Sequence, residues 1–403
     1  MPDLKRIETD CCIAGGGPAG IMLGLLLARK GANVVVLEKH ADFLRDFRGD
    51  TIHPSTLELM HELGVLEEFL KRPHQEARQI SASVGGEMIP VADFSHLPTH
   101  CKYIAFMPQW DFLNFIAEQG RKYSCFNLHM QSKVVDLLHE NGQICGVKAE
   151  TPEGPLEVHA QLTVGADGRT SIVRERAELK VNNIGAPIDV LWMKLPRSES
   201  DPDQPMGHFD RGRIFIAIYR GDYWQCGFVI RKGSLDIIKS RGLDSFRRDI
   251  AAIVPFMANR LETLSSWDDI KLLTVSVDRL KCWHRAGLLC IGDAAHAMSP
   301  VGGVGINLAI QDAVAAANLL HAPLLSGNVS EADLAKVQQR RKFPTAATQR
   351  IQVLVQNKII GEVIGDDSSL TPPWQLKLLK RFPILRRLPA RLIGLGFRAE
   401  HIN

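Results

Sequence analysis

The chain has 403 residues, which is too long for one small core and indicates two domains or one large elaborated domain. Its net charge of +3 and its 23% of charged residues give no reason to expect a nucleic-acid partner. The eight cysteines show no C-x-x-C spacing, so we expect reduced thiols and neither a disulfide framework nor a metal site. Neither a signal-peptide pattern nor an apolar run of transmembrane length is visible, and we therefore expect a cytoplasmic protein.

A glycine-rich turn follows the first predicted strand. The buried stretch that begins at Asp10 leads into Gly15, Gly17 and Gly20, which fit the pattern G-x-G-x-x-G, and residues 21–30 then follow a helical pattern. Gly15 permits the tight turn, Gly17 allows the main chain to approach a pyrophosphate, and Gly20 allows the helix to pack closely on its strand. The pattern predicts a dinucleotide site with the anion at the helix N-terminus.

An acidic residue closes this first unit. Residues 34–37 read as a second buried strand, and Glu38 stands at its end, 18 positions after Gly20. Its carboxylate can accept both ribose hydroxyls of an adenosine and would repel a 2′-phosphate. FAD or NAD therefore fits this unit better than NADP. A glycine turn of purely structural origin is the alternative, and the strand, helix and acid around the turn weigh against it.

A second domain is expected to begin early in the chain. Residues 54–64 follow a helical spacing, but residues 79–91 read as two short strands around Gly85-Gly86, which interrupt the alternation of strands and helices. Residues 109–121 are again helical, and a hairpin through Asn141-Gly142 leads back to the first domain. A mostly β platform is predicted from three further strands, at residues 190–195, 213–219 and 223–230.

Two more turns carry charged residues directly after a predicted strand. In the first, Asp167-Gly168, Arg169 and Arg174 crowd one short loop. In the second, Gly292-Asp293 is followed by a loop of small residues, and a helix rich in alanine begins at about Ile306. With the first glycine turn, the chain thus has three separated motifs in a fixed order.

These three motifs resemble those of the group A flavoprotein monooxygenases, the family of p-hydroxybenzoate hydroxylase and the ubiquinone-biosynthesis hydroxylases. The resemblance covers about residues 10–320. It implies an α/β fold in which a Rossmann-like FAD-binding domain carries an inserted, mostly β substrate domain and a helical C-terminal segment. The implied bounds are 1–75, 100–180 and 270–345 for the discontinuous FAD-binding domain, 76–99 and 181–269 for the substrate-binding β-sheet domain, and 346–403 for the C-terminal helical basic segment.

The resemblance assigns FAD contacts to all three motifs and to their surroundings. It implies that Asp293 accepts a ribityl hydroxyl, and that backbone N–H groups between Gly303 and Asn307 face the flavin ring and stabilise the anionic reduced form. For Arg48 a surface salt bridge, and for Gln109 a position at a helix N-terminus, are the alternatives. The full set is Gly15, Gly17, Pro18, Ala19, Gly20, Glu38, Lys39, Arg48, Gln109, Asp167, Gly168, Gly292, Asp293, Pro300, Gly303, Gly305, Ile306 and Asn307.

The implied activity is hydroxylation of an aromatic, polyketide or quinone-like substrate. In this family NADH or NADPH reduces the flavin, O2 adds at C4a, and the resulting hydroperoxide transfers one oxygen atom to the ring. A side-chain nucleophile is not required. His53 could act as a base for a phenol or could be a capping or packing residue, and His296 is expected to make a structural hydrogen bond. A flavin-dependent reductase of lipid double bonds and an FAD-stabilised binding protein are the alternatives, whereas the W-x-W-x-I-P pattern of flavin-dependent halogenases is absent.

Two segments bear on the small aromatic or lipophilic substrate. Alternation along the middle strands sends part of their apolar side chains toward a pocket over the flavin, although core packing is the alternative for each. Residues 374–393 alternate basic and apolar residues without an acid, which indicates either a membrane-surface helix interrupted at Pro383 and Pro389 or a solvated basic face packed on the FAD-binding domain. The residues assigned to the pocket are Met193, Phe215, Ala217, Tyr219, Trp224 and Phe228.

Overall fold

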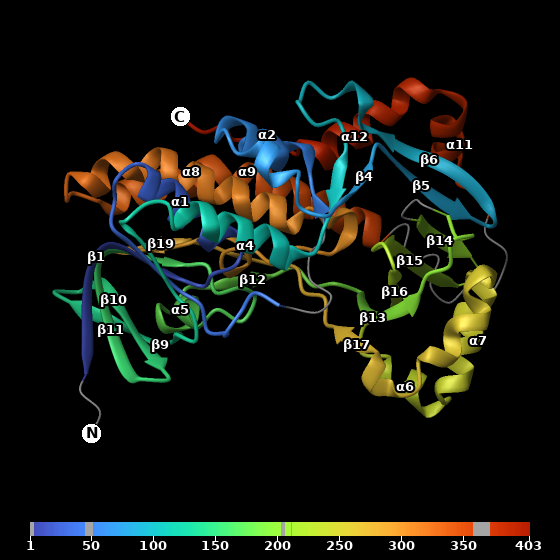
Figure 1. Ribbon diagram of the computed structural model, residues 1–403, viewed down its shortest axis with the longest axis horizontal. Helices are drawn as coiled ribbons and strands as arrows, with labels where there is room; N and C mark the ends of the chain where they lie inside the picture. The colour runs from blue at the N-terminus through green and yellow to red at the C-terminus, as the bar shows by residue number, and fades with distance from the viewer. Residues whose placement is uncertain (1–3, 45–50, 203–205, 211, 358–370) are drawn as a thin grey trace.

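The computed structural model describes residues 4–44, 51–202, 206–210, 212–357 and 371–403, which form an α/β fold with two large sheets (Figure 1). The first sheet is built around β1, which pairs in parallel with β2 on one side and with β11 on the other. Its strand order is β19-β20-β11-β1-β2-β8. The bounds are β1 Lys5–Ala14, β2 Val34–Leu37, β8 Phe126–His129, β11 Gly154–Gly165, β19 His284–Arg285 and β20 Leu288–Cys290.

A β-hairpin extends this sheet through β11. Strands β9 (Lys133–Glu140) and β10 (Gln143–Thr151) are antiparallel, and β10 pairs with β11. Between them Asn141 has a φ of 49° and Gly142 a φ of 79°. Asparagine and glycine tolerate this left-handed region at two successive positions, so the hairpin lies where the sequence predicts it.

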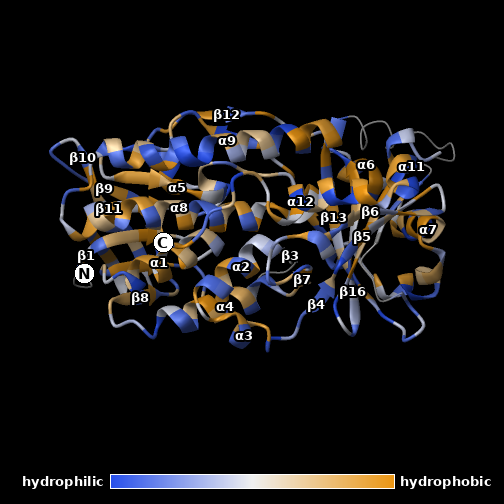
Figure 2. Cartoon of the chain, turned by 90° about the horizontal axis from the view of Figure 1, so that it is seen from above, coloured by the Kyte–Doolittle hydropathy of each residue, from blue (hydrophilic) through white to orange (hydrophobic). Residues whose placement is uncertain are grey.

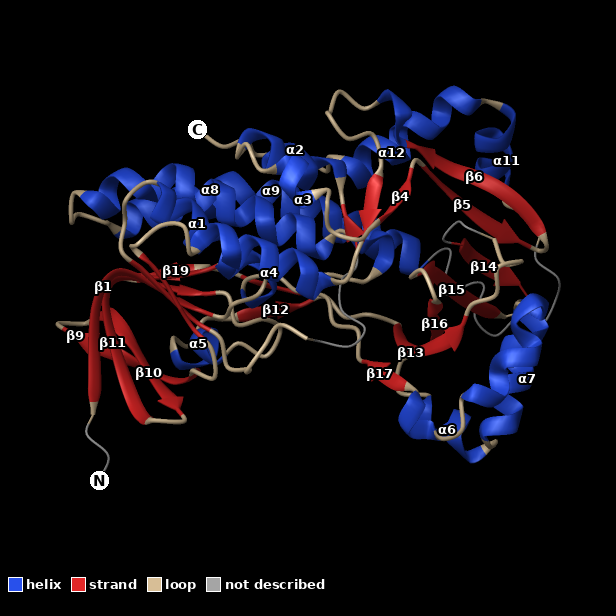
Figure 3. Cartoon of the chain, viewed as in Figure 1, coloured by secondary structure: helices blue, strands red, loops and turns tan. Residues whose placement is uncertain are grey.

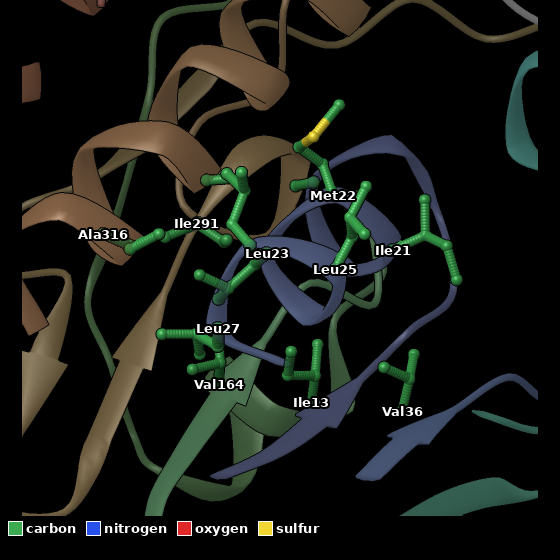
Figure 4. Packing of buried hydrophobic residues seen from close by; sticks show 14 of the residues in the cluster. Ile13, Ile21, Met22, Leu23, Leu25, Leu27, Val36, Val164, Ile291 and Ala316 are labelled. Atoms are coloured by element: carbon green, nitrogen blue, oxygen red, sulfur yellow. The ribbon is translucent and has the colours of Figure 1, made fainter. Parts of the chain in front are cut away.

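Helices cover the first sheet (Figure 3). Ten of the twelve residues of α1 (Pro18–Arg29) are buried, because α1 packs against β1, β2, α4 and α8, and Figure 4 shows its leucines beside Ile13 and Val164. Helix α8 is long and apolar enough to cross a membrane by length and composition, but 67% of its apolar window is buried inside the protein. The other helices here are α2 Pro54–Glu62, α3 Leu66–Phe69, α4 Gln109–Gly120, α5 Ile172–Arg176, α8 Gly305–Leu325 and α9 Glu331–Val355.

The second sheet combines two distant parts of the chain. Strands β5 and β6 come from the early segment, and β14 pairs in parallel with β5, which extends the sheet to the order β17-β13-β16-β15-β14-β5-β6. Helices α6 (Leu235–Ser240) and α7 (Leu243–Ile253) and the 3-10 segment η2 (Pro255–Thr263) pack on one face. The strand bounds are β5 Gln79–Val84, β6 Glu87–Asp93, β13 Ile188–Pro196, β14 Met206–Asp210, β15 Arg213–Tyr219, β16 Tyr223–Arg231 and β17 Lys271–Leu273.

Two smaller sheets complete the fold. The first has the order β3-β7-β4, in which β7 is paired with both of its neighbours, and the second consists of β12 and β18. β3 pairs Thr51 with Phe106 of β7, which brings the chain after the first unit beside the segment that precedes α4. The bounds are β3 Thr51–Ile52, β4 Gln75–Ala77, β7 Ile104–Phe106, β12 Val181–Asn183 and β18 Asp278–Leu280.

The C-terminal segment forms α11 (Trp374–Arg381), the 3-10 turn η7 (Pro383–Arg386) and α12 (Arg387–Gly394). The helix is interrupted at Pro383, as predicted, but Pro389 lies in the first turn of α12, where a missing backbone N–H leaves no hydrogen bond unmade. This segment packs mainly on the second sheet, where α11 and α12 contact β6 (Figures 1 and 2). The predicted packing on the FAD-binding domain is limited to α12, because the carbonyl of Ile393 lies 2.7 Å from Nδ1 of His53.

Candidate cofactor and substrate site

The first glycine turn leaves open space at the N-terminus of α1. A Cβ at Gly15, whose φ is 105°, would overlap the carbonyl of Ala166, and a Cβ at Gly20 would overlap the carbonyl of Gly15, so packing requires both glycines. Gly17 differs, because a Cβ there would have no atom within 4 Å. Gly17 is also the N-cap of α1 and supplies no side-chain cap to the first helical N–H groups. This open helix end, followed by Pro18, suits a phosphate group.

Glu38 contacts this turn at Gly16. It follows β2 with 8% of its surface exposed, and its two carboxylate oxygens accept hydrogen bonds from the backbone N–H groups of Gly16 and His40, each at 3.0 Å. The carboxylate is therefore held in one orientation at the end of the strand, where it could accept ribose hydroxyls. Lys39 is exposed next to it.

The second turn begins where β11 ends, and Ala166 N–H donates to the carbonyl of Ala14 at 2.8 Å. One oxygen of Asp167, Oδ2, accepts the N–H of Val173 in α5 at 3.2 Å, whereas Oδ1 is buried without a partner among the described residues. Burial raises the pKa of Asp167 despite the hydrogen bonds that it accepts. Gly168 has a φ of 88°, which glycine adopts without strain.

The third turn contacts both of the others. Gly292, whose φ is 58°, lies so close to α1 that a Cβ there would be 3.2 Å from the Cβ of Ala19. Asp293 Oδ2 is 3.1 Å from Nε of Arg169 in the second turn, and Arg169 also donates to the carbonyl of Met298. Arg169 Nη1 is buried with no partner in the part of the chain that the structure describes. The three motifs, separated by more than a hundred residues each, therefore form one site.

A network of buried charged side chains stabilises the third turn through the backbone of Gly292. Asp312 of α8 is fully buried, and its Oδ2 accepts the Gly292 N–H at 3.1 Å and contacts His296 Nε2 at 2.5 Å. Its Oδ1 accepts from Arg341 Nε of α9 at 2.9 Å, and Arg341 Nη1 also contacts Glu400 Oε1 at 3.2 Å. Burial acts to raise the pKa of Asp312, but the charges and hydrogen bonds of His296 and Arg341 outweigh it and lower that pKa.

The loop before α8 is joined to β3 and α2 by the side chain of Asn307. Asn307 Oδ1 accepts the N–H of His53 at 3.0 Å and the hydroxyl of Thr56 at 2.7 Å, and its Nδ2 donates to the carbonyl of Thr51 at 3.3 Å. Thr51 in turn donates its hydroxyl to the carbonyl of Gly303 at 2.9 Å. The amide of Asn307 is thus engaged within the protein, which leaves backbone groups of this loop for a ligand. Pro300, Gly305 and Ile306 are partly buried here.

His53 is fully buried at the start of α2. Its Nδ1 lies 2.7 Å from the carbonyl of Ile393 in α12, and because a carbonyl only accepts, Nδ1 carries the proton. Burial lowers the pKa of His53 to about 4, so the ring is neutral near pH 7 and Nε2 offers a lone pair without a partner among the described residues. Gln109 is buried at the start of α4. Arg48 lies outside the described residues.

The six predicted pocket residues lie on the face of the second sheet that packs against helices, so each makes the core packing that was the alternative to a pocket role. Met193, Phe215, Ala217, Trp224 and Phe228 belong to one core with α6, α7 and η2, and Tyr219 packs against it. Residues of the opposite parity form a separate cluster, which also includes Val301 of the loop before α8. This second face carries Val190, Trp192, Ile214, Ile216, Ile218 and Val229. The alternation of side chains between the two faces of these strands was predicted correctly, but the sequence does not indicate which face the helices cover.

Three observations on this site match FAD. The open space at Gly17 suits the pyrophosphate, Asp167 Oδ1 and Arg169 Nη1 are polar atoms without a partner among the described residues, and Asp293 is held beside them by Arg169. The sequence analysis did not predict the charged residues that support the turn, because their partners are distant in the chain and no short motif includes them. These residues are Asp312, Arg341 and Glu400.

The architecture joins a parallel dinucleotide-binding sheet to a largely antiparallel second sheet, as in two-domain flavoproteins. The family of FAD-binding domain proteins matches residues 8–351, and the chain belongs to that family. It is 33% identical over 395 residues to 6-methylpretetramide 4-monooxygenase of Streptomyces rimosus, which covers 97% of this chain and 93% of that protein. These findings confirm the resemblance to FAD-dependent aromatic monooxygenases and the fold that it implied.

More distant matches agree. Rifampicin monooxygenase of Streptomyces venezuelae is 28% identical over 75% of this chain, which spans 62% of that relative's length. The crystal structure of p-nitrophenol 4-monooxygenase PnpA from Pseudomonas putida has a TM-score of 0.80 at 20% identity, and the match covers 98% of this chain and all of that one. This structural match shows the fold.

Proposed function

We propose that the protein is an FAD-dependent monooxygenase that hydroxylates an aromatic, polyketide or quinone-like substrate with O2 and NADH or NADPH. The observation that carries the proposal is the 33% identity to 6-methylpretetramide 4-monooxygenase over nearly the whole of both chains. The contact of the three charged or glycine-rich turns at one site supports it, because all three would bind the same cofactor.

In this proposal the chain's own residues bind and orient the cofactor. The N-terminus of α1 at Gly17 receives the pyrophosphate, Glu38 accepts ribose hydroxyls, and Asp293 accepts a hydroxyl of the ribityl chain. The N-terminus of α8 directs its dipole and backbone N–H groups toward the flavin ring, as an oxyanion hole does toward its anion. When bound, FAD supplies hydride acceptance and oxygen activation.

The substrate is proposed to lie against the second sheet. Ile216 and Ile218 of β15 and Trp192 of β13 offer an apolar face that excludes water from the reacting ring. His53 Nε2, a neutral acceptor, could hold or take the proton of a substrate hydroxyl. The backbone carbonyl of Ile393 in α12 holds the proton on Nδ1, so α12 determines that Nε2 is the acceptor.

For the electron donor we propose an approach through the cavity beside the second turn. This cavity has a volume of about 680 Å3 and is lined by Arg169, Arg174 and Lys180, together with two glutamates of α5 and the segment after it. Cations in such a position favour a phosphate-bearing nucleotide. Lys180→Ala should raise the KM for NADH or NADPH while leaving FAD content unchanged.

A second candidate is catalysis or binding without net oxidation. One relative, 25% identical over 320 residues, is named dialkyldecalin synthase, so the same fold is not restricted to monooxygenases. A lipid double-bond reductase is a further alternative, which would lack substrate-stimulated oxygen use.

One assay separates these candidates. The purified protein should be yellow, release FAD on denaturation, and oxidise NADH or NADPH faster when a phenolic or polyketide ligand is added, with a product heavier by one oxygen atom. Bound FAD that neither nucleotide reduces, with any ligand of a broad aromatic panel, would contradict the monooxygenase proposal.

Asp293→Ala should release FAD more readily, and unchanged retention of FAD would exclude the ribityl contact.

The proposal includes a cytoplasmic protein with a peripheral membrane contact through the C-terminal segment. The support is the exposure of its apolar side chains: Trp374 and Leu388 are each 66% exposed.

A further inference from the structure

The largest group of exposed apolar side chains in the described chain lies on the C-terminal segment. Trp374, Ile384 and Leu388 are 66%, 64% and 66% exposed, and Phe382 is 50% exposed. We call the exposed side of residues 374–391 the outer face of α11–α12. Large apolar residues scattered singly on a surface are normal, but several in 15 residues mark an interaction site.

The shape of this outer face is fixed by contacts on the inner side. Ala390 and Gly394 are buried against Phe94 and Leu97, which follow β6, and a Cβ at Gly394 would crowd the side chain of Leu97. The break at Pro383 turns the chain so that α11 and α12 both lie along β6. The apolar side chains therefore face outward because the segment is docked in one orientation.

The same face is strongly basic. Residues 374–394 contain six lysines and arginines and no acid. Lys380 is paired with Glu87 of β6 at 2.5 Å, and Arg386 donates to the carbonyls of Leu379 and Lys380 near Asp93. The remaining cations, Lys377, Arg381, Arg387 and Arg391, are exposed.

We propose that the outer face of α11–α12 binds the surface of an anionic lipid bilayer. Aromatic and aliphatic side chains interleaved with cations suit the headgroup boundary, where the apolar groups enter the acyl region and the cations meet lipid phosphates. Complementary charge is what selects a bilayer of anionic lipids over a neutral one.

This contact would place the substrate site near the membrane. The inner side of α12 is the part of the segment that holds His53 through the carbonyl of Ile393, so the same short helix would face the lipid on one side and the proposed pocket on the other. This consequence rests on the proposed hydroxylase function. It gives a lipophilic aromatic substrate, dissolved in the bilayer, a short path to the site.

The test is flotation of the full-length protein with vesicles, which requires no substrate and no turnover. Vesicles of phosphatidylcholine alone are compared with vesicles that contain phosphatidylglycerol, at 0.1 M and at 1 M NaCl. The wild type should float with the anionic vesicles at low salt and be released at high salt, because the Debye length falls from about 10 Å to about 3 Å.

Two variants and a matched control complete the experiment. Lys377→Gln, Arg381→Gln and Arg387→Gln together should weaken binding on the order of 100-fold, about fivefold for each cation removed. Trp374→Ser, Ile384→Ser and Leu388→Ser together should abolish flotation. The control, Ile237→Ser, Leu325→Ser and Leu354→Ser, changes residues that are 67%, 51% and 50% exposed elsewhere and should float like the wild type.

Three results would overturn the proposal: equal binding to neutral vesicles, no binding to either, or equal losses in the control. Self-association that the apolar variant abolishes, without vesicle binding, would assign the face to a second copy of the chain instead. Circular dichroism and FAD content verify that each variant is folded. Since NADH or NADPH oxidation is measured separately in solution, failure of the membrane contact and failure of the hydroxylase proposal remain distinguishable.

Discussion

Gly17 offers a substitution that should weaken cofactor binding without harming the fold. Its φ of −72° is open to any residue, and a Cβ there would have no atom within 4 Å. Gly17→Val should therefore leave the free energy of unfolding of the apoprotein within about 0.5 kcal/mol of the wild type. The added methyl groups would instead occupy the space where a pyrophosphate would approach the N-terminus of α1.

The expected loss of affinity follows from the contacts that the pyrophosphate would make. A hydrogen bond to a charged group contributes about 1.5–3 kcal/mol, and displacement of the phosphate from two backbone donors would remove about 3–6 kcal/mol. This corresponds to an increase of the Kd for FAD of roughly 10²- to 10⁴-fold. Gly17→Ala, with a smaller side chain, should give a smaller loss in the same direction.

The assay is titration of apoprotein with FAD, followed by quenching of flavin fluorescence, next to urea unfolding of the same apoprotein. Gly31→Ala is the matched control, since Gly31 has a φ of 93° in an open turn after α1, and strain there should lower stability but leave FAD affinity unchanged. A wild-type Kd in Gly17→Val would refute the placement of the pyrophosphate. A large loss of apoprotein stability would refute the claim that the space is empty.

Three further predictions concern stability and the pocket. Arg341→Met should lower the free energy of unfolding by about 3–5 kcal/mol in urea titrations, because Asp312 and Glu400 lose the buried cation that they share and keep only His296 and Arg340 as side-chain partners. Burial lowers the folded-state pKa of His53 from 6.5 to about 4, so below pH 6.5 the unfolded chain binds a proton that the folded protein does not. The free energy of unfolding should therefore fall by roughly 3 kcal/mol as the pH is lowered from 6.5 to 4. In His53→Gln the free energy of unfolding should change less over that range. Ile216→Trp should abolish ligand stimulation of NADH or NADPH oxidation in a folded protein, whereas Phe215→Ala should cost about 3–5 kcal/mol of stability and keep the stimulation.

The local elements were predictable because short-range patterns determine them. The glycine turn before α1, the hairpin at Asn141-Gly142 and the break at Pro383 each depend on backbone angles that only a few residue types adopt. The pattern that indicated FAD was also local, since a strand, three glycines and Glu38 lie within one continuous stretch. Family membership then followed from the order of three such stretches along the chain.

The sequence by itself determined the motifs, the parity of the strands and the class of cofactor. The tertiary structure decided which face of the second sheet meets the first domain, because Phe215 and Ile216 are equally apolar and only the packing of α7 and η2 on one side buries the former. It also decided that Asp312, Arg341 and Glu400 meet beneath Gly292. These groups are distant in the chain, and their charges are stabilised only once folding has removed water and brought the partners together.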